Sequence, residues 1–166
     1  MKVTIVVDVQ IDFVDGALGS TQAQSMIPQL VNKLKNIQND LIFTQDTHKA
    51  NYLETAEGRF LPITHCIKNT PGWYLVPEIE PFAKKGQVIE KASFGSTRLP
   101  SMLKKYDDVE LCGLCTDICV ISNALLIKAF YPEKNIIIDS SCCAGSSQEA
   151  HDAALLVMQK CGCQIN

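Results

Sequence analysis

The sequence has no hydrophobic run that approaches the ~20 residues needed by a membrane-spanning helix, so we expect no membrane anchor. It has no lysine or arginine cluster longer than a pair and no basic segment interleaved with aromatic residues, which gives nucleic-acid binding little support. No signal peptide is expected, because the first apolar run begins almost at Met1. These absences predict a cytoplasmic protein whose partner is a small molecule.

The chain has 166 residues, of which 46% are hydrophobic and 20% charged, with a net charge of −3. This composition is typical of a globular protein, and the length predicts one domain over residues 1–166. The eight cysteines would suggest disulfides in a secreted protein, but no secretion signal is expected here. Reduced thiols are the better interpretation, since five cysteines lie within or beside apolar segments: Cys66, Cys112, Cys142, Cys143 and Cys161.

Short apolar runs alternate with segments of helical periodicity along the chain. Strands are predicted at residues 3–7, 41–44, 88–90, 109–112, 135–139 and 161–165, and helices at 23–37, 99–105, 120–130 and 148–160. Strands separated by helices form right-handed βαβ units. The pattern therefore predicts an α/β fold, a doubly wound, mostly parallel six-stranded sheet with helices on both faces.

The segment from Asp46 to Phe82 interrupts this alternation. It holds four prolines, two glycines and no clean periodicity, and it is far longer than an ordinary connection. Two of the three histidines and the only tryptophan lie within it. We therefore expect an ordered, functional segment.

Three chemically distinct side chains stand at or just beyond predicted strand ends. Asp8 follows the first strand, Lys91 follows Val88–Glu90, and Cys119 lies just past the strand that ends at Cys112. Reactive groups in open α/β sheets collect outside the carboxyl ends of the strands, so the three residues are expected to converge. A thiol beside a carboxylate and an ammonium group indicates a cysteine hydrolase.

Cys119 is predicted to lie in the first turn of a helix, behind Gly113, Thr116 and Asp117. The free backbone N–H groups and the helix dipole at such a position are expected to lower the pKa of the thiol. The same N–H groups could bind an oxyanion.

A carboxylate and two imidazoles in the irregular segment could bind a metal. Asp46 and His48 share one face of an extended chain, and His65 follows seventeen residues later, with Glu57 or Glu54 available as a further ligand. Such a set suits zinc, iron or manganese. The alternative is that His48 belongs to a loop and His65 packs in the core.

These motifs resemble those of the isochorismatase-like cysteine hydrolases, and within that superfamily they are most similar to nicotinamidases. The resemblance covers nearly the whole chain and rests on five matches in order: Asp8-Val9-Gln10-Ile11-Asp12-Phe13, Asp46-Thr47-His48, the Leu-Pro-x-x-His-Cys run ending at Cys66, Lys91, and the Gly-x-x-Thr-Asp-x-Cys-Val run ending at Val120. It implies a cysteine amidohydrolase that converts nicotinamide to nicotinate and ammonia through a thioester on Cys119. It also implies a role in NAD salvage and pyridine nucleotide metabolism.

The resemblance further implies the roles of individual residues. The implied triad is Asp8, Lys91 and Cys119, and a cis peptide between Leu114 and Cys115 directs the N–H groups of Cys115 and Cys119 at the substrate oxygen. The implied metal ligands are Asp46, His48 and His65 with a fourth position that Glu57, or otherwise Glu54, would fill. Zinc is the expected metal, with iron or manganese as alternatives. Phe13 and Leu114 are expected to line the substrate pocket, and we expect a homo-oligomer.

Other functions stay open. Leu61 stands before Pro62, where well-studied nicotinamidases often carry a tryptophan, so another small amide or a ureido acid is an alternative substrate. A distant alternative is a thiol-disulfide redox protein that uses Cys112 and Cys115. A non-catalytic binding protein is disfavoured because the acid, the lysine and the thiol are all retained.

Overall fold

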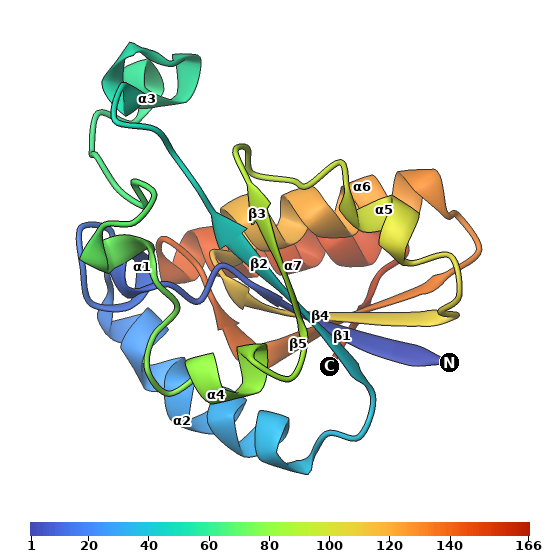
Figure 1. The fold of residues 1–166 in the computed structure, drawn as a ribbon. Coiled ribbons are helices and arrows are strands. Elements are labelled where there is room, and N and C mark those ends of the chain that lie inside the picture. Colours follow the sequence, from blue (N-terminus) through green and yellow to red (C-terminus); the bar gives the residue numbers. More distant parts are fainter.

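The computed structural model describes all residues, 1–166, and contains one six-stranded sheet in which every strand pairing is parallel (Figure 1). The strand order is β3-β2-β1-β4-β5-β6, so the predicted α/β class is confirmed. The strands are β1 (Lys2–Val7), β2 (Asp40–Asp46), β3 (Gln87–Lys91), β4 (Asp108–Leu114), β5 (Asn135–Ala144) and β6 (Gln164–Ile165).

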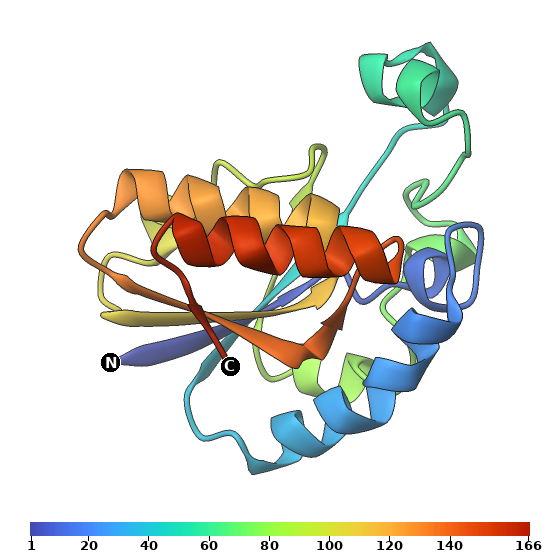
Figure 2. The same ribbon diagram turned by 180° about the vertical axis from the view of Figure 1, so that it is seen from behind.

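The helices cover both faces of the sheet, which gives three layers (Figures 1 and 2). α2 (Thr21–Asn36) and α4 (Glu80–Ala83) lie on one face, whereas α5 (Leu99–Met102), α6 (Ile121–Phe130) and α7 (Gln148–Lys160) lie on the other. The hydroxyl of Ser20 caps α2 by accepting a hydrogen bond from the N–H of Ala23. None of the helices has the length and apolarity needed to cross a bilayer.

The long segment after β2 is ordered and contains short helices. Within it, η2 (Pro71–Trp73) lies beside α1 (Ile11–Val14), while η1 (Tyr52–Glu54) and α3 (Ala56–Phe60) form an arm that projects from the body of the molecule (Figure 1).

Two elements are shorter in the structure than the sequence predicted. The helix predicted over 99–105 ends at Met102, and the last strand has only two residues.

The sheet brings the carboxyl ends of β1 to β4 to one edge. Val7 is in register with Thr44 on one side and with Gly113 on the other, and Asp46 is in register with Lys91. The chain order reverses between β1 and β4, which is the switch point where open α/β sheets bind ligands. The parallel pairing thus sets residues from distant parts of the sequence side by side.

Gly113 allows the end of β4 to approach β1 closely. Its φ is +116°, and a Cβ at this position would lie 2.2 Å from the carbonyl oxygen of Val7. Both the backbone conformation and the absence of space therefore require glycine.

We predict that Gly113→Ala lowers the free energy of unfolding by at least about 3 kcal/mol, because backbone strain and a clash act together. Gly162→Ala is the matched control, since Gly162 also has a positive φ, +87°, but its nearest neighbour is the flexible Lys128 side chain at 3.4 Å. The control should cost only about 1 kcal/mol. Urea denaturation of both variants measures the difference, and equal losses would contradict the close-approach argument.

Candidate functional site

Asp8, Lys91 and Cys119 meet at the carboxyl edge of the sheet, as the sequence predicted. The ammonium Nζ of Lys91 lies 2.6 Å from Oδ2 of Asp8 and 3.5 Å from Sγ of Cys119. All three residues are buried, and the side chain of Lys91 is only 1% exposed. Lys91 also donates to the carbonyl of Ser93, at 3.0 Å, and to Oδ1 of Asp46, at 3.1 Å.

Asp8 is held in an unusual conformation at the end of β1. Its φ is +48°, in the left-handed region that aspartate tolerates better than most residues. The hydroxyl of Thr44 on β2 donates to Oδ1 of Asp8 at 2.6 Å and accepts the backbone N–H of Asp8 at 3.2 Å. This pairing leaves Oδ2 facing Lys91.

The protonation of the cluster differs from the sequence prediction in one respect. Burial raises the pKa of the Cys119 thiol well above its ordinary value, and the Asp8 charge raises it further, against the lowering effect of Lys91. The predicted lowering by the helix start is therefore wrong, because desolvation dominates for a completely buried sulfur. Burial also raises the pKa of Asp8. Burial opposes a charged ammonium at Lys91, but the charges of Asp8 and Asp46 raise the pKa of Lys91 above its ordinary value. The resting cluster is a thiol beside a carboxylate–ammonium pair.

Cys119 lies in a π-helical turn rather than in a regular first helical turn. β4 ends at Leu114, the peptide bond between Leu114 and Cys115 is cis as predicted, and η3 (Thr116–Val120) then leads into α6. The backbone N–H of Cys115 donates to no acceptor within the protein. It is therefore free to bind an oxygen of a ligand.

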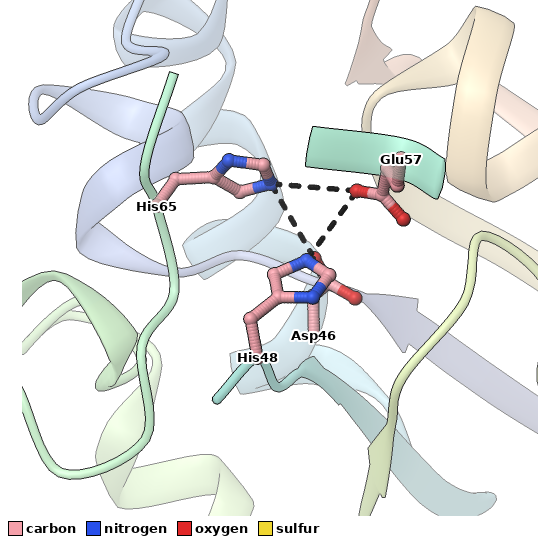
Figure 3. A group of neighbouring side chains, drawn as sticks. All are labelled: Asp46, His48, Glu57 and His65. Carbon is pink, nitrogen blue, oxygen red and sulfur yellow. Dashed lines mark ion pairs between the residues drawn. The ribbon is translucent and has the colours of Figure 1, made fainter. Parts of the chain in front are cut away.

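The candidate metal ligands also come together (Figure 3). One ligand atom from each of Asp46, His48, Glu57 and His65 lies within 4.8 Å of the others. Nε2 of His48 is 2.8 Å from Oδ2 of Asp46 and 3.4 Å from Oε1 of Glu57, whereas Nε2 of His65 is 3.7 Å and 3.8 Å from the same two oxygens. The structure brings Glu57 into this group and not Glu54, which is exposed at the end of η1.

These four residues fit a divalent cation. Nε2 of His48 and Oε1 of Glu57 are buried and complete no hydrogen bond with the protein, so both are available as ligands. Nδ1 of His65 lies 2.7 Å from the carbonyl of Ile63, which fixes the tautomer that leaves Nε2 free for a metal. Two imidazoles and two carboxylates form a donor set that suits zinc, iron or manganese.

A cavity of about 360 Å³ lies against both clusters. Cys119 and Cys115 border it on one side, Asp46, Glu57 and His65 on another, and apolar side chains complete it: Phe13, Leu18, Leu61, Phe94 and Ile118. Phe13 thus lies where the resemblance implies. A cavity of this size accommodates a small ring compound.

Leu114 and the only tryptophan both lie away from the cavity. Leu114 is completely buried in the core and does not border the cavity, whereas Cys115 does. The predicted place of Leu114 in the pocket is not supported. Trp73 is also absent from the cavity, since its indole donates to the hydroxyl of Thr47.

Sequence reasoning missed several residues that support the site. The side-chain amide of Gln10 pairs with both backbone groups of Asp46, at 2.7 and 2.8 Å, as an additional strand would. The Tyr52 ring packs against His48 and His65, with centroids 4.6 and 4.9 Å apart. Gln10 lies within the motif from Asp8 to Phe13, but no sequence pattern predicts which backbone groups its side chain will reach.

Cys112 and Cys115 do not form a redox pair. Both are free, and Cys112 is completely buried in β4 with its thiol directed at the carbonyl of Ile5, 3.7 Å away. Burial raises the pKa of Cys112 well above its ordinary value, whereas a redox-active thiol needs a low pKa and access to solvent. The redox alternative therefore has no support.

Comparison with known proteins gives consistent matches over the whole chain. The family model of the isochorismatase domain matches residues 2–165. A nicotinamidase of Schizosaccharomyces pombe is 29% identical and the match covers 91% of this chain and 86% of that protein. The structure of a pyrazinamidase/nicotinamidase from Streptococcus mutans is 30% identical, covers 100% of both chains and superposes with a TM-score of 0.85. The pyrazinamidase of Pyrococcus horikoshii in complex with zinc is 28% identical, with a TM-score of 0.82 over 99% of this chain and 98% of that chain.

Proposed function

This chain belongs to the isochorismatase family, and on that premise we propose that it is a cysteine amidohydrolase that converts nicotinamide to nicotinate and ammonia. One observation carries the proposal. A buried thiol with a carboxylate–ammonium pair beside it borders a small, largely apolar cavity, and three of the four candidate metal ligands line the same cavity. The nicotinamidase and pyrazinamidase relatives support the same chemistry.

Asp8 is proposed to act as the general base that accepts the proton of Cys119. A buried carboxylate with a raised pKa accepts a proton more readily than an exposed one, and Lys91 offsets the negative charge that the thiolate acquires. The proton therefore moves from Cys119 to Asp8 within the buried cluster, and the thiolate that remains is the nucleophile.

The thiolate then attacks the amide carbonyl carbon. The N–H groups of Cys115 and Cys119 are proposed to stabilise the oxyanion, and the free N–H of Cys115 supports this role. Collapse of the tetrahedral intermediate breaks the C–N bond, and Asp8 returns its proton to the departing ammonia. Water, deprotonated by Asp8, then hydrolyses the thioester and releases the acid and the thiol.

We propose that Asp46, His48, Glu57 and His65 hold a divalent cation, with zinc first and iron or manganese as alternatives. Such a cation would supply a Lewis-acidic point for the ring nitrogen of a pyridine amide. The zinc complex of a pyrazinamidase relative supports this assignment. Within the chain, Lys91 and Gln10 orient Asp46, and the carbonyl of Ile63 orients His65.

A second substrate class is favoured by one feature of the cavity. Leu61 borders it where the resemblance predicts a tryptophan, so one wall offers an aliphatic rather than an aromatic surface. Small amides without an aromatic ring, including ureido acids, therefore remain candidates.

We predict that the purified, metal-loaded protein releases ammonia from nicotinamide and pyrazinamide faster than from ureido acids, because Phe13 and the apolar cavity favour a flat ring. An enzyme-coupled ammonia assay across this panel tests the prediction. If the ureido acids are turned over faster, they are the preferred substrate class. If no compound in the panel releases ammonia, the amidase proposal is wrong.

Proposals for domain organisation, cellular location and oligomeric state follow from the core, the cysteines and the exposed apolar side chains. We propose that residues 1–166 form one catalytic domain, since a single core of 40 buried hydrophobic residues draws on both faces of the sheet. Eight free cysteines fit a reducing cytoplasm. A role in NAD salvage follows from the proposed conversion of nicotinamide to nicotinate. Exposed apolar side chains on the arm, with Phe60 88% exposed, support a homo-oligomer.

A further inference from the structure

Asn123 lies one turn beyond Cys119 and is completely buried. Its side-chain N–H groups donate to the carbonyl of Cys119 at 2.7 Å and to the carbonyl of Phe94 at 3.2 Å, and its Oδ1 accepts the backbone N–H of Ser96 at 2.8 Å. Both ends of the amide are therefore used. The partners belong to two separate segments, the turn that carries the nucleophile and the loop after β3.

The loop from residue 92 to residue 97 begins at Lys91. The Lys91 ammonium donates to the carbonyl of Ser93, and Phe94 borders the cavity beside Cys119. The loop also packs directly on α6, because a Cβ added to Gly95 would lie 3.3 Å from the carbonyl oxygen of Ser122. A shift of this loop relative to α6 would consequently move both Phe94 and the carbonyl that helps to hold the Lys91 ammonium.

We propose that Asn123 is a positioning residue that fixes the Lys91–Phe94 loop against the Cys119 turn and so sets the distance between the ammonium and the thiol. The inference rests on the proposed function, in which Cys119 is the nucleophile. The Lys91–Cys119 separation of 3.5 Å is long enough that a further shift leaves no direct contact. Misplacement of reacting groups by about 1 Å can cost 10²-fold in rate.

A purely structural role would also explain a buried, fully bonded asparagine, and it predicts a different result. Losing hydrogen bonds in the core lowers stability but leaves the turnover of the folded molecules unchanged. The test therefore compares turnover per folded molecule with stability.

The first variant is Asn123→Ala, which removes all three hydrogen bonds. The second is Gly95→Ala, which leaves Asn123 intact and pushes the loop from α6 by a few tenths of an ångström. The matched control is Thr4→Val, since Thr4 is completely buried, donates to Glu110 at 2.9 Å, accepts from Asn39 at 3.0 Å and lies in β1 four residues before Asp8. The control measures the loss of a buried hydrogen bond away from the site.

We expect kcat per folded molecule to fall about tenfold or more in Asn123→Ala, with KM within about threefold of wild type, because positioning acts on the reacting groups. Gly95→Ala should lower kcat in the same direction, and Thr4→Val should lose stability while keeping kcat. The proposal is overturned if Gly95→Ala, or a folded Asn123→Ala, turns over substrate within twofold of wild type. If Asn123→Ala does not fold, the kcat of Gly95→Ala by itself tests the proposal.

Alkylation of Cys119 by iodoacetamide separates this inference from the proposed function, because it needs no substrate. The rate at pH 8, mapped to Cys119 by mass spectrometry, should fall about threefold or more in both loop variants, since a displaced ammonium stabilises the thiolate less. If wild type hydrolyses no amide, the proposed function fails, while slower alkylation in both variants still supports the positioning role. Wild-type alkylation rates in both variants would contradict it.

Discussion

Cys119→Ala should abolish ammonia release from nicotinamide, by at least about 10⁴-fold or ~5.5 kcal/mol in the activation barrier, while the protein remains folded. The large effect follows from the mechanism, because no other group can form the thioester. Cys115 also borders the cavity, but burial raises its pKa to about 12 and it has no base beside it of the kind that Asp8 provides for Cys119.

The fold should tolerate this change. Removing one sulfur from a buried position costs about 1 kcal/mol, and Lys91 keeps Asp8, Asp46 and the Ser93 carbonyl as partners. Lys91 itself is a poorer target, since its removal would leave two buried carboxylates without a counter-charge. Thermal unfolding followed by circular dichroism checks that the Cys119 variant is folded.

Cys112→Ala is the matched control for the loss of a cysteine. Cys112 is equally buried on β4 but directs its thiol at the carbonyl of Ile5, away from the cavity. This variant should lose some stability and retain kcat within about threefold. Substantial turnover by Cys119→Ala, or a comparable loss in Cys112→Ala, would remove the thioester mechanism.

His48→Ala should remove the metal and the amidase activity together and leave the fold in place. The imidazole of His48 is central to the group, since its Nε2 lies closest to both carboxylates, at 2.8 Å and 3.4 Å. Removing one of four ligands leaves an incomplete set that should not retain a divalent ion through dialysis. Elemental analysis of the dialysed proteins gives metal per chain directly.

The reactive cluster should survive this substitution. Asp8, Lys91 and Cys119 contact one another without His48, so the rate at which iodoacetamide alkylates Cys119 should stay within about threefold of wild type. The alkylation rates should be compared above neutral pH, because burial raises the pKa of Cys119. His151→Ala is the control for the loss of a histidine, since His151 pairs with Thr116 outside the metal group and its removal should leave the metal content unchanged. Retention of stoichiometric metal by His48→Ala would show that the ligand set is wrong.

The architecture and the three reactive residues follow from sequence patterns alone. Apolar runs alternating with helical periodicity predict a parallel sheet covered on both faces, because that pattern can bury its apolar residues only in a layered βαβ arrangement. Asp8, Lys91 and Cys119 could be named from their places after strands, since parallel strands end at one edge. Element boundaries were less certain, as the helix predicted over 99–105 and the last strand illustrate.

Distances between side chains and the burial of each group come from the folded arrangement and from no sequence pattern. Glu57 rather than Glu54 joins the histidines because the arm turns its side chain inward, and Leu114 packs in the core instead of lining the pocket. The raised pKa of Cys119 reverses the expectation from its helical position, since desolvation depends on every surrounding atom and not on the local sequence. The hydrogen bonds from Asn123 to the loop after Lys91 also depend on tertiary packing. They join residues that are far apart in the sequence and that come within hydrogen-bonding distance only because the loop after β3 packs against α6.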